Sequence, residues 1–261
     1  MARSHDNTFA WITAAAFTVA SLATMANPGT QAERVQSRIL KLGSFGTNPE
    51  GGVSRPGFSE ADHAARAWII PELASLGLEV RTDNAANIIA RRPGSDNSLP
   101  AIAFGSHIDS VPNGGNYDGQ AGVVASLEVM ETLNDNGVVT RHPLELLIFV
   151  AEEDGLFGSA AMSGVLQAEN LGFVTNSGRS VADGMDFLGG DSGAVKRAER
   201  SADDFSGFVE LHIEQGPYLD RVKIDIGLVQ GMVGIEDWDI GVTGIDNHSG
   251  TTPLNSREDA L

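Results

Sequence analysis

The run Leu144-Glu-Leu-Leu-Ile-Phe-Val150 is apolar along almost its whole length. Strands of this composition are typical of positions buried on both faces of a parallel or mixed sheet. Before it, apolar residues recur at helical spacing from Val123 to Leu133, and Gly137 closes this predicted helix. Residues 101–104 predict a further strand. Strand, helix and strand in this order predict an α/β domain with functional residues at the carboxyl ends of its strands.

Earlier segments extend the same pattern. Ser59 precedes apolar residues at helical spacing that continue to Gly77, so we predict a helix there, kinked at Pro71. Residues 78–81 and 88–91 then predict two short strands. The expected fold class is therefore α/β with a mixed sheet.

The last third of the chain changes character. Residues 176–206 are rich in Gly, Ser, Asp and Arg, and we interpret them as helix and loop. Residues 208–213 predict another apolar strand. Apolar residues alternate over 231–242, which predicts a new sheet and a second domain, followed by a helix from about Asn255. The domains expected after the first 26 residues are 27–230, a catalytic metal-binding portion, and 231–261, the start of a lid or dimerisation domain.

The first 26 residues have the features of a signal peptide. Arg3 precedes an Ala-rich apolar run from Phe9 to Met25, and small residues allow cleavage after Ala26. We therefore expect an exported, periplasmic protein. An uncleaved membrane anchor is the alternative, because the run approaches the roughly 20 residues that span a bilayer. A plain amphipathic helix is a third interpretation.

Composition limits the classes of function. The chain has 261 residues and 41% hydrophobic content, enough for a substantial core. Acidic residues outnumber basic ones by 35 to 17, and a net charge of −18 argues against binding to nucleic-acid phosphates. The absence of cysteine excludes disulfides, thiol nucleophiles and Cys-type zinc sites. Metal binding is thereby left to histidine and carboxylates.

Polar residues follow the predicted strands in a pattern typical of a two-metal hydrolase. His107 ends an apolar run, and Asp109 is placed to hold the second nitrogen of its ring. Asp118 can bridge two cations, and the adjacent Glu152 and Glu153 can divide the roles of base and ligand.

Each of these residues also has an ordinary interpretation. A histidine at a strand end is often only hydrogen-bonded, and paired carboxylates are often a solvated strand end. His212 is a stronger candidate, because it too follows an apolar run. His63 and His142 lack acidic neighbours of this kind, and His5 lies in the predicted signal peptide.

Several separate motifs resemble one family in its own order. The family is the hydantoinase/carbamoylase amidases, which include N-carbamoyl-L-amino acid hydrolases, β-ureidopropionases and allantoate amidohydrolases, within the aminoacylase and carboxypeptidase metallopeptidase superfamily. The resemblance runs from about Arg34 to the last residue. The motifs are Gly51-Gly-Val-Ser-Arg55, Phe58-Ser59, Gly105-Ser-His-Ile-Asp109 with its extension to Gly115, Tyr117-Asp-Gly119, Glu210-Leu-His-Ile-Glu-Gln-Gly-Pro217, Asn247-His-Ser-Gly-Thr-Thr-Pro253 and Arg257-Glu-Asp-Ala-Leu261.

The resemblance implies two divalent metal ions, zinc or manganese. One would be held by His107, Asp118 and His212, and the other by Asp118, Glu153 and a further histidine beyond Leu261. It also implies a mixed-sheet, zinc-peptidase-like catalytic domain with an inserted α+β lid, incomplete in this chain, through which the protein forms a homodimer.

The resemblance also assigns catalytic roles. Glu152 would be the general base that takes a proton from a metal-bridging water. Gln215 and Asn247 would contact the substrate. His248 would reach into the partner subunit's cleft and stabilise the oxyanion.

One motif departs from the family pattern. The family usually shows Glu-Glu-Gly, a small residue, Arg and Phe, whereas this chain has Glu152-Glu-Asp-Gly-Leu-Phe157. An alignment without a gap makes Glu152 the base and Glu153 the ligand. A one-residue gap would move these roles to Glu153 and Asp154.

The expected function is a metal-dependent amidohydrolase that cleaves a linear ureido or carbamoyl amide of a small molecule. An aminoacylase or dipeptidase of the same superfamily is the nearest alternative. Because the last ligand is expected beyond Leu261, an inactive, C-terminally truncated metal-binding fragment is another. An exported solute-binding protein is a fourth interpretation, in which His107, Asp118 and His212 would be structural.

Overall fold

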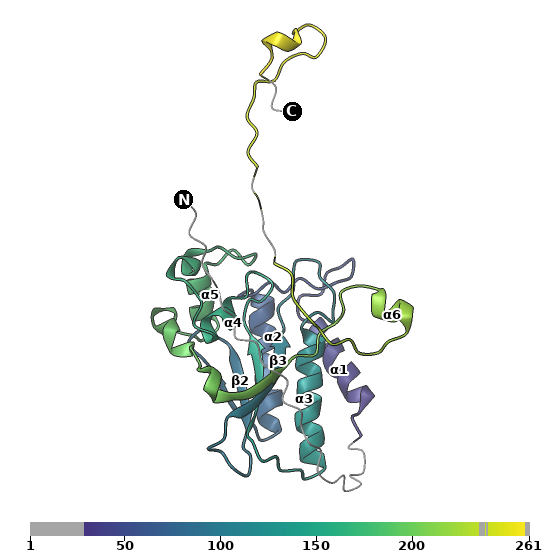
Figure 1. Cartoon of the computed structure of the whole chain (residues 1–261), viewed down its shortest axis with the longest axis vertical. Coiled ribbons are helices and arrows are strands. Elements are labelled where there is room, and N and C mark those ends of the chain that lie inside the picture. Colours follow the sequence, from purple (N-terminus) through teal and green to yellow (C-terminus); the bar gives the residue numbers. More distant parts are fainter. Residues whose placement is uncertain (1–28, 235–237, 239, 259–261) are drawn as a thin grey trace. The chain divides into compact units, whose positions relative to one another are not determined.

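The computed structural model describes residues 29–234, 238 and 240–258. The predicted signal peptide lies outside these residues. The chain divides into two compact units between Gln215 and Gly216. The first unit contains a five-stranded sheet flanked by helices (Figure 1). The predicted domain boundary near Gly231 stays a prediction.

The sheet has the order β1-β2-β4-β3-β5. The central pair β3 and β4 is parallel, β5 runs parallel to β3, and β2 is antiparallel to both β1 and β4. The mixed-sheet α/β prediction is therefore confirmed, and the carboxyl ends of β3, β4 and β5 meet at one edge. The strands are β1 (Glu79–Thr82), β2 (Ile88–Arg92), β3 (Ala101–His107), β4 (Leu144–Phe149) and β5 (Phe205–Val209).

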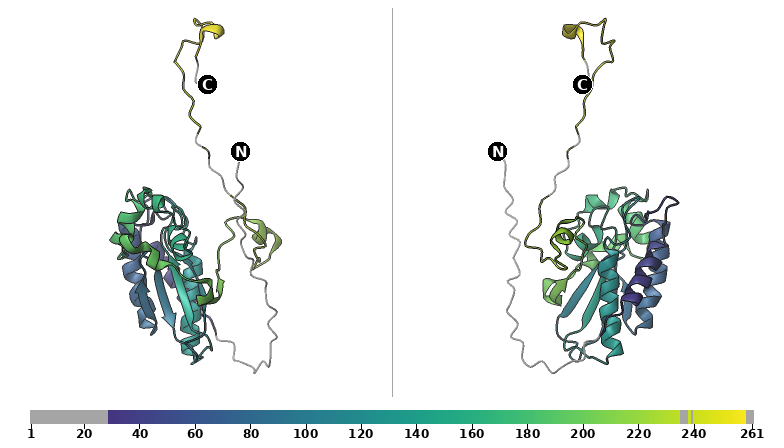
Figure 2. Two further views of the ribbon diagram at one scale, coloured as in Figure 1. Left: turned by 60° about the vertical axis from the view of Figure 1, so that its left-hand side comes forward. Right: turned by 90° about the vertical axis from the view of Figure 1, so that its right-hand side faces the viewer.

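Three helices cover one face of the sheet (Figure 2). Leu42, Ile69 and Leu127 from these helices pack with Ile88 and Leu146 from the strands in the largest core cluster. The helices are α1 (Ala32–Gly43), α2 (Glu60–Ser75), which contains Pro71, and α3 (Gln120–Asp135).

The helix α2 begins where the capping pattern predicted. Ser59 is its N-cap, and the Ser59 hydroxyl accepts a hydrogen bond from the amide of Asp62. A serine in this position satisfies an amide that would otherwise lack a partner within the helix. The cap thus fixes the start of α2 from local sequence alone.

Shorter helices cover the opposite face. Met162 of α4 packs with Ile89 and Leu147, which alternate with the strand residues that face the larger core. An apolar groove of about 750 Å³ runs along α4, β4 and β5, and none of its lining residues is a predicted metal ligand. The helices are α4 (Phe157–Met162), α5 (Val181–Phe187) and the 3-10 turns η1 (Ala168–Gly172), η2 (Ser192–Ala198) and η3 (Ala202–Asp204).

Two predicted strands differ in the structure. The strand predicted at residues 208–213 is formed by Phe205–Val209, because pairing with β3 ends at Phe104 and Val209. The described residues of the second unit contain no strand, so the described residues within the alternating segment 231–242 form none. Alternation stabilises a strand only where a neighbouring strand accepts its backbone hydrogen bonds and its apolar face is covered.

The described part of the second unit contains two short elements. They are α6 (Tyr218–Val222) and the 3-10 turn η4 (Leu254–Ser256). The helix predicted from Asn255 is thus a single tight turn among the described residues, because the backbone of Arg257 is already extended. Within the described residues, no helix combines the length and apolarity needed to cross a bilayer.

Candidate metal centre

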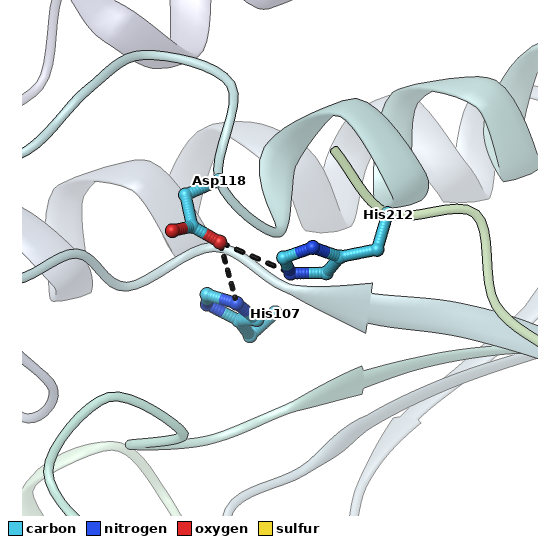
Figure 3. A group of neighbouring side chains, drawn as sticks. All are labelled: His107, Asp118 and His212. Carbon is cyan, nitrogen blue, oxygen red and sulfur yellow. Dashed lines mark ion pairs between the residues drawn. The ribbon is translucent and has the colours of Figure 1, made fainter. Parts of the chain in front are cut away.

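Two histidines and an aspartate from three separate segments meet at the carboxyl edge of the sheet (Figure 3). His107 ends β3, Asp118 lies just before α3, and His212 follows β5. The Asp118 Oδ1 atom lies 3.0 Å from His212 Nε2 and 3.7 Å from His107 Nε2. One nitrogen or oxygen atom of each residue lies within 4.8 Å of the others. A single cation can therefore contact all three side chains.

Gly119 allows His107 and Asp118 to approach each other. Its φ of +64° is left-handed, and a Cβ atom at this position would lie 2.4 Å from His107 Nε2. Any larger residue would strain the backbone and push the imidazole aside. The close approach of His107 to Asp118 therefore requires a glycine at position 119.

The His107 ring is held by its neighbour Asp109. His107 Nδ1 lies 3.1 Å from the Asp109 carbonyl oxygen and 3.6 Å from its carboxylate. With its proton on Nδ1, the imidazole donates to this carbonyl and presents Nε2 to the centre. The sequence predicted that Asp109 holds the second nitrogen of the His107 ring. In the structure, the hydrogen bond is made by the backbone carbonyl of Asp109.

The electrostatics of His107 are dominated by negative charge. Burial alone would lower the pKa of this 2% exposed residue. The nearby carboxylate of Asp109, with the charges of Glu152 and Glu153, outweighs burial and raises the pKa of His107 to about 9. The site therefore attracts positive charge, which a proton or a metal ion can supply.

Glu152 reaches the centre from the end of β4, and Glu153 follows it in the chain. Ala151 has a φ of +47°, so the backbone leaves the strand pleat just before them. Glu152 Oε2 lies 3.6 Å from His107 Nε2. Burial raises the pKa of both glutamates, and nearby carboxylates add to this effect while His107 opposes it. Two carboxylates at one site favour a cation between or beside them.

Asp154 is engaged elsewhere. Its Oδ1 atom accepts hydrogen bonds from the backbone amide and the side-chain amide of Asn176, at 2.9 and 2.8 Å. The amide of Glu153 in turn donates to the Asp109 carboxylate at 3.1 Å. Asp154 is thus held by Asn176, whereas Glu152 lies beside His107.

The remaining predicted residues divide between the two units. Gln215 Nε2 donates to Asp118 Oδ2 at 2.5 Å, so its amide contacts the proposed bridging carboxylate. Asn247 and His248 belong to the second unit. There, the Asn247 side chain donates to the Ile245 carbonyl, and His248 Nδ1 accepts from the Gly250 amide.

Sequence reasoning gave Arg55 no role, although it supports the centre. Its buried guanidinium donates to the carbonyls of Ile108, Leu42 and Phe45. Through Ile108, it fixes the backbone between His107 and Asp109. A signal was present, because Arg55 ends the Gly51–Arg55 motif, but an arginine in a polar loop is usually solvated.

The chemistry of these groups suits a divalent metal. Imidazole and carboxylate ligands together favour a divalent cation over soft metal ions. Asp109 Oδ1 is buried without a hydrogen-bond partner and lies 3.6 Å from His107 Nδ1, so its negative charge favours a cation bound through that ring. His107, Asp118 and His212 therefore fit one metal ion, and Glu152 and Glu153 add negative charge near His107.

Comparisons with known proteins identify the family of the chain. The model of the peptidase family M20/M25/M40 matches residues 103–260. An N-carbamoyl-L-amino-acid amidohydrolase from Paenarthrobacter aurescens is 43% identical over 238 residues, which are 88% of this chain and 57% of the relative. An allantoate amidohydrolase from Bacillus subtilis (strain 168) is 34% identical over 84% of this chain and 54% of the relative.

A solved structure shares the fold. It is a hydantoinase/carbamoylase family amidase from Burkholderia ambifaria, with a TM-score of 0.72 and 32% identity over 88% of this chain and 57% of that one. The chain thus spans little more than half the length of these relatives. The expected resemblance and the zinc-peptidase-like fold are both confirmed. This chain belongs to the peptidase family M20/M25/M40.

Proposed function

We propose that the whole protein is a metal-dependent amidohydrolase that cleaves a linear ureido or amide bond of a small molecule. The observation that carries this proposal is the group of His107, Asp118 and His212 with Glu152 beside it. The names of the relatives from Paenarthrobacter aurescens and Bacillus subtilis support the choice of a carbon–nitrogen bond other than a peptide bond.

The donor set supports a metal centre held by His107, Asp118 and His212. We extend this to a second ion held by Asp118 and Glu153 with a further histidine from a longer chain, and to zinc or manganese as the metal. A divalent cation bound there would polarise the substrate carbonyl and acidify a water molecule. The neighbouring side chains then need only to orient the reactants and move one proton.

Glu152 is the proposed general base. Its raised pKa lets its Oε2 atom accept a proton from water and pass it to the leaving nitrogen. Water adds to the ureido carbon, the carbon–nitrogen bond breaks, and ammonia departs with the proton. The carbamate that remains loses carbon dioxide and leaves an amine or amino acid. The hydrogen bonds that Asp154 accepts from Asn176 favour Glu152 and Glu153, rather than Glu153 and Asp154, as base and ligand.

The roles of Gln215, Asn247 and His248 follow the family resemblance. We propose that Asn247 and Gln215 bind the substrate and that His248 stabilises the oxyanion in the cleft of a partner subunit, in a homodimer formed through the lid. A His248→Ala variant should lower turnover and leave metal content unchanged. Unchanged turnover would exclude the oxyanion role.

Export to the periplasm is a further part of the proposal, and it rests on residues 1–26. N-terminal sequencing of the protein recovered from a periplasmic fraction should begin at Asn27. Recovery with residue 1 intact in the membrane fraction would instead support an anchor.

Ammonia release tests the function. The assay would use N-carbamoyl-L-amino acids and allantoate, with zinc or manganese, and would compare this chain with a form as long as its relatives. We expect metal-dependent ammonia release by the longer form. Hydrolysis of N-acyl amino acids or dipeptides instead would favour an aminoacylase or dipeptidase. Metal binding without hydrolysis of any of these would favour a binding protein.

A further inference from the structure

His212 lies on a segment that the sheet itself does not hold. Pairing between β3 and β5 ends at Phe104 and Val209, so His212 lies three residues beyond the last pair. The segment from Glu210 to His212 is exposed and has no regular secondary structure. Something other than strand pairing must therefore place the imidazole 3.0 Å from Asp118.

A side-chain hydrogen bond continues the contact between the two strands. The Ser106 hydroxyl donates to Glu210 Oε1 at 2.6 Å. Ser106 is 1% exposed and directly precedes His107 on β3, whereas Glu210 lies two residues before His212. The bond therefore joins the backbone that carries one histidine to the backbone that carries the other.

A second contact holds the same segment against α3. A Cβ atom on Gly122 would lie 2.3 Å from the Leu211 carbonyl oxygen and 3.0 Å from Ser106 Cβ. Only glycine lets the Leu211 backbone come this close to the helix. The Leu211 carbonyl, which precedes His212, thus lies against Gly122 and next to the Ser106 side chain.

We infer that Ser106, Glu210 and Gly122 are positioning residues that set His212 against Asp118 and His107. The inference rests on the proposed metal centre, which these three residues do not themselves touch. A charged acceptor makes the Ser106–Glu210 bond stronger than a neutral one. Loss of such outer contacts typically weakens metal binding about 10- to 100-fold.

The test measures the affinity of the full chain for Zn²⁺ by competition with a chelator, and the ligand-field spectrum of bound Co²⁺. Ser106→Ala and Glu210→Ala should each weaken Zn²⁺ binding about tenfold or more. The Co²⁺ spectrum should shift toward that of His212→Ala. Glu210→Gln keeps an oxygen acceptor for Ser106 and should restore most of the affinity. Because the two side chains form one bond, the double alanine variant should bind Zn²⁺ about as weakly as either single variant.

Matched controls separate positioning from folding. Ser126 is a buried serine on α3 that bonds to a carbonyl of its own helix, and Glu145 is a buried acid on β4 that pairs with Arg91 and Arg200. Ser126→Ala and Glu145→Ala should change thermal stability but not the Zn²⁺ affinity. Gly122→Ala should weaken Zn²⁺ binding as Ser106→Ala does.

The possible failures are distinguishable. If the unaltered chain binds Zn²⁺ and the Ser106 and Glu210 variants bind it equally well, the inference is overturned and the metal centre stands. If the unaltered chain binds no Zn²⁺ and gives no Co²⁺ spectrum, the metal centre and the inference both fail. Equal losses in Glu210→Ala and Glu145→Ala would also overturn the inference, since both effects would then come from folding.

Discussion

His107 is subject to several opposing local interactions at the candidate metal centre. It is buried, its Nδ1 atom faces Asp109, and its Nε2 atom faces Asp118 and Glu152. Burial and carboxylates push its pKa in opposite directions, and the carboxylates prevail. A buried imidazole in such surroundings gains most from a bound cation, which also neutralises the nearby acids.

The first prediction concerns Glu152. Glu152→Gln keeps the size of the side chain but cannot accept a proton, so turnover by the full-length enzyme should fall by more than about 100-fold. Zinc affinity should remain within about threefold of the unaltered protein, since Glu152 is not among the three grouped ligands. Steady-state ammonia release and chelator competition measure the two quantities. Loss of metal with retained turnover per bound metal would make Glu152 a ligand instead.

A second prediction at this scale uses Asp62, a buried carboxyl on α2. Burial raises its pKa from 3.8 to about 6, against the opposing charge of Arg66. Between these two values the folded chain binds a proton that the unfolded chain does not. The contribution of Asp62 to stability is therefore present at low pH and is lost as the pH rises through about 6.

Urea unfolding at two pH values tests the direction of this pH effect on stability. On going from pH 7 to pH 5, the Asp62 carboxyl should add about 1 kcal/mol to the free energy of unfolding. Asp62→Asn should lose this increment, whereas a control at the exposed Asp203, Asp203→Asn, should keep it. Identical pH dependence in the unaltered chain and Asp62→Asn would contradict the assignment of the shift to this group.

At the scale of elements, the spacing between β3 and β4 depends on one glycine. Gly105 has a φ of +155°, and a Cβ atom there would lie 1.9 Å from the Leu147 carbonyl oxygen on β4. The two strands pair in parallel along this stretch, with Gly105 opposite Leu147. The contact lies two residues before His107, so the same strand pairing also sets the position of His107 at the edge of the sheet.

Gly105→Ala should therefore lower the free energy of unfolding by about 3 kcal/mol or more, since the strands must separate or the backbone must shift. Gly137 offers a matched control, because its φ of +62° is also left-handed but nothing lies within 4 Å of an added Cβ. Gly137→Ala should cost only about 1–2 kcal/mol. Equal losses in urea unfolding would mean that backbone strain, not the contact with β4, limits both positions.

At the scale of the whole molecule, the metal centre joins segments that are far apart in the sequence. Its ligands come from the end of β3, the start of α3 and the segment after β5. An ion that binds all three constrains the folded first unit and not the unfolded chain. Metal binding should therefore raise the stability of the unit by mass action.

Thermal unfolding at increasing Zn²⁺ measures this coupling. At a free concentration 100 times the Kd, the gain should be about 2.7 kcal/mol, and a chelator should reverse it. His212→Ala should lose the gain, whereas His142→Ala should retain it, because His142 bonds to Pro100 and Ser206, which are not part of the metal centre. A similar rise in Tm for both variants would place the stabilising ion elsewhere.

The predictable elements are those with strong local patterns. The helix after Ser59, the strands from 79 to 107, the helix after Gly119 and the strand at 144 all form close to where periodicity and caps indicated. The strand β5 was misplaced, because its apolar residues continue past the point where pairing with β3 stops. The first helix, α1, was not predicted.

The candidate ligands could be named from the sequence because each follows an apolar run or precedes a glycine, which is a local pattern that the chain carries by itself. Their meeting could not be deduced in the same way. The approach of His212 to His107 depends on the parallel pairing of β3 and β5 and on the hydrogen bond from Ser106 to Glu210. It also depends on the close contact between the Leu211 backbone and Gly122. Such contacts depend on strand order and register between distant segments, and no neighbouring residues encode them.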